Sequence, residues 1–382
     1  MNAQTMRQQL VEQAKQETGL DNFGDPRCFE GLDVYVETIE RNVLDDAGKA
    51  RLLKIQYKKL ISRLKIFDAF DRQPEILREE IAAPIFVTGL PRSGTSALLN
   101  LLAADPDSRP LAQWELRHPE PYPGLKRGAP DPRYLDLVEK MSSQQDSEFR
   151  KMHYADADTP EECVMLHQLS FEGVQTGFEI MLEPYHDWFL NRDLDWMYKE
   201  YRDFLKILQW QRPGKRWVLK APAHMWALDS VMKYFPDASI VWGHRNPVGV
   251  TASVSSMNRQ VMNLFMGDTS HLDQNAIART VMDFYARSLE RGLAARATLN
   301  SAQFMDYNHK EFITDSLGTI ERIFSTFNLP LSESSRTALA THIEQHPQHK
   351  HGKHEYNLSD FGLSEELIKD RFSFYSFQEH YA

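Results

Sequence analysis

The chain has 382 residues, of which 42% are hydrophobic and 26% are charged, and its formal net charge is −10 at pH 7. This composition is typical of a globular protein with a sizeable core. The negative charge argues against general binding to nucleic acid or anionic membranes, because both partners need a basic face. Any anion-binding site must therefore be a local group of basic residues.

Two cysteines, Cys28 and Cys163, provide neither a disulfide framework nor the spacing of a zinc site. The first twenty residues are polar and lack the apolar core of a secretion signal. No apolar run approaches the roughly 18 residues that a membrane-spanning helix requires. We therefore expect a cytoplasmic protein without a membrane span. The sequence leaves open whether the chain is a homo-oligomer.

Residues 1–80 are expected to form a helical region that packs on the rest of the chain. Within residues 51–67, apolar residues such as Leu53, Leu60 and Leu64 recur at helical spacing between lysines and arginines. This pattern indicates a packing or oligomerisation layer without chemistry of its own. We expect residues 81–382 to form the main domain, in one folded unit with residues 1–80.

The stretch PIFVTGLPRSGTSALLN, at residues 84–100, combines an apolar run, a glycine-bracketed loop and a leucine-rich run. It predicts a strand at 84–88, a loop whose backbone N–H groups cradle a phosphate, and a helix at 95–104. Nucleotide triphosphatases place a lysine directly after the second glycine of such a loop. Here that position holds Thr95, and the cation, Arg92, lies inside the loop.

Residues 105–133 are rich in proline and predict a long surface loop beside a ligand. At Thr159 the sequence TPEE offers a threonine N-cap, a proline at the first helical position and acids in the first turn. This arrangement predicts that a helix begins there. Residues 160–212 are predicted to be mostly helical.

Two further apolar runs, RWVLKAP at 216–222 and ASIVWGHRNP at 238–247, predict buried parallel strands that are each followed by a helix. Residues 275–300 and 316–328 are also predicted to be helical. This alternation of strands and helices predicts an α/β fold, with one parallel sheet that is flanked by helices on both faces.

Basic residues follow each of the three predicted strands. The first strand leads into the loop with Arg92, the second ends at Lys220, and the third ends at His244 and Arg245. Ligands of open parallel sheets bind beyond the carboxyl ends of the strands, so these cations predict a multiply charged anion. A magnesium-dependent triphosphatase would need the loop lysine and an acidic strand end. We therefore expect the protein itself, without a metal, to neutralise the anion.

These motifs resemble those of sulfotransferases that use 3′-phosphoadenosine 5′-phosphosulfate (PAPS), and most of all those of the bacterial sulfotransferase-like family. The family motifs PIFVxGLPRSGTS, WE, TPEEC, WVLKAPxH, HRxP and FGL lie here at residues 84–96, 114–115, 159–163, 217–224, 244–247 and 361–363. The resemblance implies a P-loop-like sulfotransferase fold for residues 81–382. It also implies PAPS as co-substrate, adenosine 3′,5′-bisphosphate as product, and no metal.

The resemblance assigns the 5′ end of PAPS to the loop residues Leu90, Pro91, Arg92, Ser93, Gly94, Thr95 and Ser96. Backbone N–H groups, the Arg92 side chain and the two hydroxyls at the end of the loop would contact the 5′-phosphate and the sulfuryl oxygens. Arg92 would also stabilise charge on the bridging oxygen as its bond breaks. Lys220 would be a second cation near the transferring group.

Arg245 and Ser253 are implied to bind the 3′-phosphate. Ser253 lies about two turns into the helix after Arg245, on a face that can return to the strand edge. On its own, Ser253 would instead be a small residue that packs this helix on the sheet. Lys350 and Lys353, in HKHGKH at 349–354, resemble a basic loop that closes over the nucleotide. A solvated polar tail is the alternative for these two lysines.

The residue that takes the proton of the acceptor is open. Cytosolic sulfotransferases use the histidine of a Lys-x-His motif, but this chain has Pro222 at that position. Golgi-type sulfotransferases use a glutamate after the loop helix, and Glu115 matches its place. His153 is the second candidate, and His167 and His224 are weaker ones. A base must lie within hydrogen-bond reach of the acceptor hydroxyl.

We expect transfer of the sulfuryl group from PAPS to a hydroxyl group by direct in-line attack. A P-loop kinase or NTP hydrolase, and a catalytically silent nucleotide-binding protein of the same fold, are the alternatives. Residues 170–189 and 257–266 are rich in aromatics and methionine, and they either belong to the core or line an apolar cleft. Together with the negative net charge, they predict a small, largely apolar acceptor such as a phenol, a sterol-like alcohol or a lipid alcohol.

Overall fold

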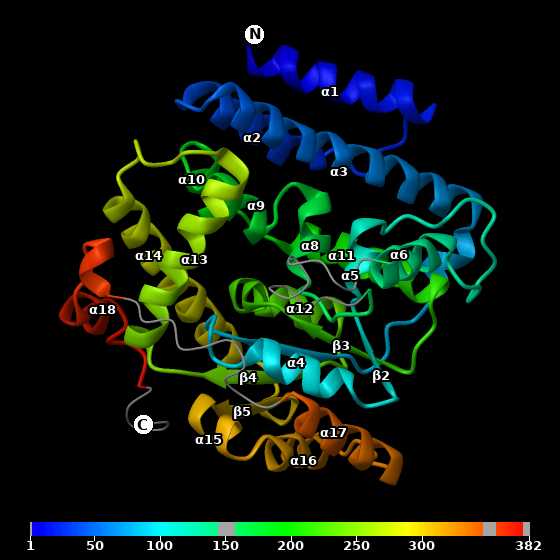
Figure 1. The fold of residues 1–382 in the computed structure, drawn as a ribbon, viewed down its shortest axis with the longest axis vertical. Helices are drawn as coiled ribbons and strands as arrows, with labels where there is room; N and C mark the ends of the chain where they lie inside the picture. Colours follow the sequence, from blue (N-terminus) through cyan, green and yellow to red (C-terminus); the bar gives the residue numbers. More distant parts are fainter. Residues whose placement is uncertain (1, 144–156, 347–356, 377–382) are drawn as a thin grey trace.

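The computed structural model describes residues 2–143, 157–346 and 357–376. Within these residues, a five-stranded parallel sheet is flanked by helices (Figure 1). The strands are β1 (Ile85–Gly89), β2 (Ser108–Pro110), β3 (Arg216–Lys220), β4 (Ser239–His244) and β5 (Phe304–Asn308), and they lie in the order β2–β3–β1–β4–β5. The predicted α/β class and parallel sheet are therefore confirmed.

Strands β1, β3 and β4 each begin within one residue of the start that was predicted for them. The sequence analysis missed the two edge strands. Strand β2 lies in the proline-rich stretch 105–133, which was predicted as a surface loop and also contains the helix α5 (Gln113–Arg117). Strand β5, with the sequence FMDYN, lacks the continuous apolar run that marks the central strands.

The two faces of the sheet bury alternate side chains of the strands. On one face, Val87, Val218 and Val241 pack with α4 (Thr95–Ala103), α16 (Ser316–Thr326) and α17 (Glu333–Gln345). On the other face, Phe86 and Leu219 pack with α11 (Asp195–Gln211), α12 (Leu228–Tyr234) and α14 (Gln274–Arg296). The apolar core therefore lies on both sides of the sheet and leaves the carboxyl ends of its strands for a ligand.

Further helices surround this core. They are α6 (Pro132–Ser143), α8 (Val164–His167), α9 (Val174–Ile180), α10 (Tyr185–Leu190), α13 (Pro247–Met266), α15 (His309–Thr314) and α18 (Glu365–Arg371). Short 3₁₀ turns are η1 (Pro74–Arg78), η2 (Gln168–Ser170), η3 (Pro222–Ala227), η4 (Ser301–Gln303) and η5 (Leu358–Phe361). The predicted helices at 275–300 and 316–328 correspond to α14 and α16.

The helix that was predicted to begin at Thr159 is wrong. The Thr159 carbonyl accepts from the Gln113 N–H, Pro160 forms a bridge with Ala112, and α8 begins only at Val164. The segment is held in an extended form because its backbone hydrogen bonds go to the chain beyond β2, not to a helical turn of its own. Residues 160–212 then form a series of short helices before the long helix α11.

The N-terminal helices are α1 (Ala3–Thr18), α2 (Cys28–Arg41) and α3 (Asp46–Arg72), and they lie together at the end of the molecule away from α15–α17 (Figure 1). They share an apolar cluster in which Leu32 and Leu64 pack with Phe171 and Trp196 from the rest of the chain. The predicted helical character of residues 1–80 is thereby confirmed for this stretch of the described chain.

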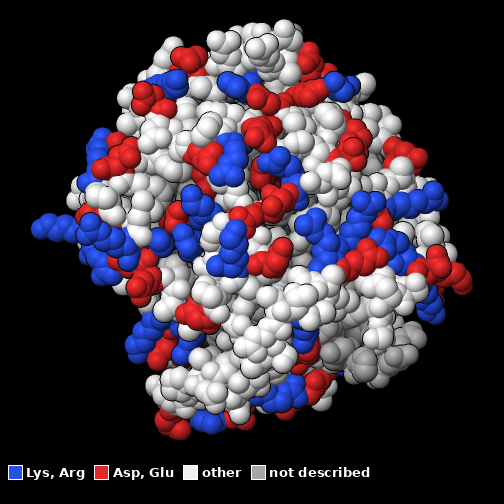
Figure 2. Space-filling model, turned by 180° about the vertical axis from the view of Figure 1, so that it is seen from behind, with Lys and Arg blue, Asp and Glu red and all other residues white. Residues whose placement is uncertain are grey.

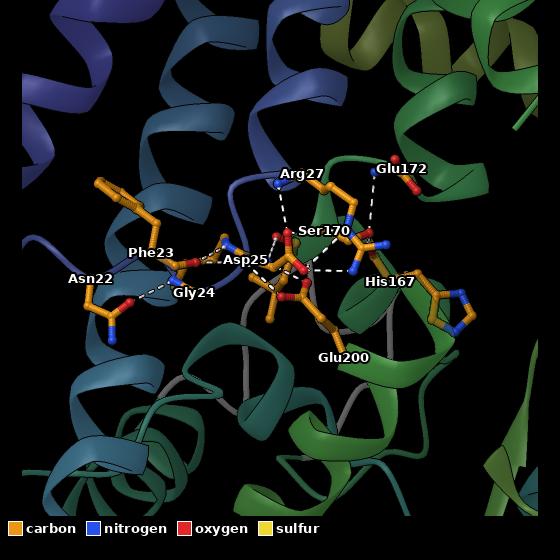
Figure 3. Close-up of polar contacts among 11 residues, drawn as sticks. Asn22, Phe23, Gly24, Asp25, Arg27, His167, Ser170, Glu172 and Glu200 are labelled. Carbon is orange, nitrogen blue, oxygen red and sulfur yellow. Dashed lines mark hydrogen bonds and ion pairs between the residues drawn. The ribbon is translucent and has the colours of Figure 1, made fainter. Parts of the chain in front are cut away.

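A buried ion pair joins the N-terminal helices to α11. The Arg63 guanidinium is fully buried and donates to both carboxylate oxygens of Glu200, at 2.7 and 2.8 Å, and to the carbonyls of Phe23 and Leu169. Figure 3 shows Glu200 between the connection that follows α1 and the segment around Ser170. This pair fixes the packing of α3 against the rest of the chain, since a buried charge is costly without its partner.

Charges of both signs are interspersed over the face of the molecule shown in Figure 2. Among the helices of the described ranges, none is long and apolar enough to cross a membrane.

Candidate functional site

The glycine-bracketed loop joins β1 to α4 as predicted from the sequence. Gly89, with φ of 131°, faces Gly243 of β4 so closely that a Cβ atom would come within 2.2 Å of the Gly243 carbonyl oxygen. Gly94 has φ of 88° and is the N-cap of α4. Both positions therefore require glycine. Arg92 has φ of 65°, a conformation that is uncommon outside glycine and that often marks a functional loop.

Within the loop, some residues build its shape and others face solvent. The buried Ser93 hydroxyl donates to the Leu90 carbonyl at 2.6 Å, which closes the turn on itself. Arg92 and Ser96 are exposed, and the backbone N–H groups of the first turn of α4 follow directly. An anion at this helix N-terminus would meet these donors together with the Arg92 side chain.

Lys220, at the end of β3, is brought to the same loop. Its ammonium group donates to the Ser96 hydroxyl at 2.8 Å and forms a close ion pair with Glu162. The residue is only 2% exposed, so its charge is largely removed from water and depends on these partners. The structure thus places Lys220 beside the start of α4, as the sequence analysis expected for a cation near the loop.

Arg245 follows β4, and its guanidinium donates to the Arg92 carbonyl at 2.5 Å. Burial and then the nearby Arg92 charge lower the pKa of Arg245 below its usual range. Burial, Arg245 and Arg92 likewise lower the pKa of His309 to about 4. Sequence reasoning missed His309, which lies at the start of α15 and packs against Gly94. Arg92 and Arg245 together form a concentration of positive charge that favours a bound anion.

Ser253 lies on α13, the helix that begins directly after Arg245 with Asn246 as N-cap and Pro247 in its first turn. Ser253 is only 7% exposed. The pairing of Arg245 and Ser253 at a 3′-phosphate stays a prediction.

The His244 ring takes part in a hydrogen-bond network inside the protein, whereas the sequence analysis expected a cation for the ligand at this position. Its ring nitrogens contact the Tyr375 hydroxyl at 2.6 Å and the Asp306 carboxylate at 2.7 Å, and Asp306 also receives two hydrogen bonds from Arg296. Burial raises the pKa of Asp306, but the hydrogen bonds from Arg296 and His244 outweigh it and lower the pKa to about 2. This network ties β4 and β5 to α14.

The surroundings of Glu115 weigh against its predicted role as base. Glu115 is only 1% exposed, and its two carboxylate oxygens accept from the Arg109 guanidinium at 2.7 and 2.5 Å. One of these oxygens also accepts from the Ala112 N–H at 3.0 Å, which caps α5. The carboxylate is therefore fully engaged inside the protein. Its role as base stays a prediction, as does that of His153, which lies outside the described residues together with Lys350 and Lys353.

The two weaker histidine candidates are core residues. His167 and His224 are no more than 1% exposed, and their rings lie 5.5 Å apart. Burial lowers the pKa of His167 to about 3 and lowers that of His224 well below its usual range. Both rings are therefore neutral, and neither faces solvent where an acceptor would enter.

Sequence reasoning also missed Glu162, the ion-pair partner of Lys220. It was interpreted as an acid in the first turn of a helix, and only the observed course of this segment, with Pro160 bridged to Ala112, brings it to the end of β3. Among the described residues, no group of three His, Cys, Asp or Glu side chains is arranged to hold a metal ion. The donors that the described loop offers are cations, hydroxyls and N–H groups.

Comparisons with known proteins agree with this geometry. The sequence model of the Sulfotransferase family matches residues 84–333. The crystal structure of sulfotransferase STF9 from Mycobacterium avium is similar with a TM-score of 0.88 and 27% identity, over 98% of this chain and 97% of that one. The structure of sulfotransferase STF1 from Mycobacterium tuberculosis H37Rv has a TM-score of 0.81 and 31% identity, over 96% of this chain and 98% of that one.

A curated relative is the omega-hydroxy-beta-dihydromenaquinone-9 sulfotransferase Stf3 of Mycobacterium bovis, which is 21% identical over 317 residues, or 78% of this chain and 76% of the relative. The family model spans well over half of the chain and contains the loop, Lys220 and Arg245. On these grounds, the chain belongs to the sulfotransferase family.

Proposed function

We propose that this sulfotransferase transfers the sulfuryl group of PAPS to the hydroxyl group of a small, largely apolar acceptor and releases adenosine 3′,5′-bisphosphate. The observation that carries the proposal is the gathering of Arg92, Lys220 and Arg245 around one loop at the carboxyl edge of the sheet. A donor with separated anionic groups fits such a distribution of cations, since each cation can neutralise a different group.

In this proposal the loop and Arg92 hold the 5′ end of the nucleotide, and Lys220 lies beside the transferring group. Arg245 and Ser253 hold the 3′-phosphate. Burial, and then the positive charges of Arg92 and Arg245, lower the pKa values of Arg245 and His309, so a bound anion would be favoured beside these two arginines. Charge on the bridging oxygen would develop next to donors that are already in place, and this is the arrangement that favours group transfer.

An apolar acceptor is supported by an aromatic group near Lys220 and Glu162. The ring of Phe178 stacks on Tyr285 at 5.8 Å and meets Phe284 edge-on at 5.2 Å. Phe284 also stacks at 5.0 Å on Trp226 of η3, and η3 begins at Pro222, directly beyond the end of β3, so these rings pack beside the strand end that carries Lys220. The relative Stf3 is named for a lipid-like hydroxylated menaquinone, and a lipid alcohol or phenol is the acceptor class that we propose here.

Many residues of the two segments that were predicted to line the acceptor cleft belong to the core. Phe171, Tyr185 and Phe189 of the first segment are fully buried, as are Met262 and Met266 of the second. The half-buried Phe178 is the residue of the first segment that we assign to the acceptor site.

The nucleotide part of the proposal is tested by a thermal-shift panel of adenosine 3′,5′-bisphosphate, ATP and GTP, each with and without Mg²⁺. Adenosine 3′,5′-bisphosphate should stabilise the protein without metal, by about 2.7 kcal/mol when the free ligand is at roughly 100 times its Kd. A preference for ATP, or a strict need for Mg²⁺, would instead indicate a kinase or an NTP hydrolase.

The acceptor part is tested by turnover of labelled PAPS with a panel of hydroxyl compounds. Long-chain alcohols, sterol-like alcohols and phenols should accept the label. Turnover that is confined to polysaccharides or charged sugars would show that the acceptor class is wrong, and nucleotide binding without any turnover would identify a silent nucleotide-binding protein.

A further inference from the structure

Glu162 is held at the carboxyl edge of the sheet by the backbone on both of its sides. The Glu161 N–H donates to the carbonyl of Leu111, just beyond β2, at 2.9 Å. The Cys163 N–H donates to the Lys220 carbonyl, at the end of β3, at 3.0 Å. Residues 161–163 therefore bridge the ends of two neighbouring strands, and this fixes the direction in which the Glu162 side chain leaves the backbone.

The Glu162 carboxylate forms a chain of polar contacts that leads to the loop. It pairs with the Lys220 ammonium group, which in turn donates to the Ser96 hydroxyl at 2.8 Å. Ser96 lies in the first turn of α4, where the loop presents its N–H groups. The carboxylate is thus two contacts away from the place where the loop would hold an anion.

Glu162 is also accessible, in contrast to the other candidate bases of the described chain. Its side chain is 34% exposed, whereas Glu115 is buried in its pair with Arg109 and the two histidines lie in the core. A base must come within hydrogen-bond distance of the acceptor hydroxyl. Phe284, the neighbour of Tyr285, stacks at 5.0 Å on Trp226 of η3, the turn that follows Lys220, so an apolar acceptor packed on this aromatic group would present its hydroxyl near the end of β3, where Glu162 lies.

We propose that Glu162 is the general base of the transfer, an inference that rests on the function proposed above. The carboxylate takes the proton of the acceptor hydroxyl while the hydroxyl oxygen forms a bond to sulfur. The bond between sulfur and the bridging phosphate oxygen breaks, and its electron pair leaves with adenosine 3′,5′-bisphosphate. Lys220, which contacts Glu162 directly, holds the carboxylate in place.

The test compares Glu162→Gln with Glu161→Gln. The amide of Glu162→Gln can still accept a hydrogen bond from Lys220 but cannot take a proton. Glu161 belongs to the same segment, and its carboxylate forms no ion pair within the described residues, so its variant controls for the loss of one charge. Turnover is measured with an aliphatic alcohol and with a phenol that is acidic enough to ionise near neutral pH. Calorimetry measures binding of adenosine 3′,5′-bisphosphate.

We expect Glu162→Gln to lose about 10²–10⁴-fold in turnover of the aliphatic alcohol, with nucleotide affinity retained. The melting temperature should fall by a few degrees, because the buried Lys220 loses its counter-charge. The loss should shrink by about tenfold or more for the acidic phenol, which needs little help to lose its proton. Glu161→Gln should behave as wild type. Glu162→Asp, which keeps a carboxylate, should retain more turnover than Glu162→Gln and serves as the second variant if the amide disturbs folding.

Three results would overturn the inference. Equal losses for both acceptors would show that Glu162 only positions Lys220. Unchanged turnover would show that Glu162 neither takes the proton nor positions Lys220. Loss of nucleotide binding in Glu162→Gln would make it a part of the nucleotide site rather than a base. If wild-type protein does not bind adenosine 3′,5′-bisphosphate at all, the proposed function fails, and the role of Glu162 fails with it.

Discussion

The substitution Glu115→Gln distinguishes two roles of Glu115, that of the general base and that of the buried ion-pair partner of Arg109. If Glu115 is the base, the variant should keep its stability and lose turnover by about 10²–10⁴-fold. The structure indicates the reverse, because both carboxylate oxygens are occupied by Arg109 and the side chain is only 1% exposed. Glu115→Gln leaves the buried guanidinium without a counter-charge.

Breaking a buried pair from one side costs about 3–5 kcal/mol. A chain of 382 residues has an unfolding entropy near 0.8 kcal/mol per kelvin, from about 2.1 cal/mol/K per residue. The melting temperature of Glu115→Gln should therefore fall by about 4–6 °C, which calorimetry measures directly. Glu365→Gln is the matched control, since its partner Lys369 is exposed and such surface pairs contribute about 1 kcal/mol or less. A variant of Glu115 with unchanged melting temperature, intact nucleotide binding and no turnover would refute the structural interpretation.

Three further predictions concern other charged groups of the chain. Arg245→Ala should weaken binding of adenosine 3′,5′-bisphosphate by about 1.5–3 kcal/mol and affect a ligand without the 3′-phosphate much less, and equal losses in titration calorimetry would show that Arg245 does not contact that phosphate. Glu200→Ala should destabilise the protein by about 3–5 kcal/mol, because Arg63 is buried without it; a change below 1 kcal/mol in chemical denaturation would contradict this. Asp306 has a pKa of about 2 in the folded protein, below its ordinary value of 3.8. The stabilisation that its ionised carboxylate contributes is therefore fully present above pH 3.8 and is lost as the pH falls towards 2. The stability difference between wild type and Asp306→Asn should therefore shrink by about 2 kcal/mol between pH 4 and pH 2, and a difference that does not depend on pH would refute the assignment.

The central strands could be predicted from the sequence because they are buried on both faces and read as continuous apolar runs. The edge strands could not. Strand β5 carries Asp306 and Asn308 at positions that a sheet edge leaves partly open, and β2 has only three residues and ends in Pro110. Local patterns carry little information about strands of this kind, since their pairing is decided by neighbours that are distant in sequence.

The candidate site was predicted in part. Glycine spacing located the loop, and the strand ends located Lys220 and Arg245. The sequence could not show that Arg245 would bind the Arg92 carbonyl, nor that Glu162 would pair with Lys220, because both contacts join segments that lie 58 or more positions apart. At Thr159 the local helix signals were outweighed by backbone hydrogen bonds to the chain beyond β2.

Because the TPEE segment was interpreted as the start of a helix, the sequence analysis assigned no role to Glu162. Had a helix begun at Thr159, the two glutamates would have lain in its first turn and pointed along its surface. In the observed segment, the backbone of residues 161 and 163 is bonded to the chain beyond β2 and to the end of β3, and the Glu162 carboxylate reaches Lys220. The sheet edge thereby brings together cations and the partly exposed carboxylate of Glu162. Transfer to a neutral hydroxyl needs both, because negative charge develops on the leaving phosphate while a proton leaves the acceptor.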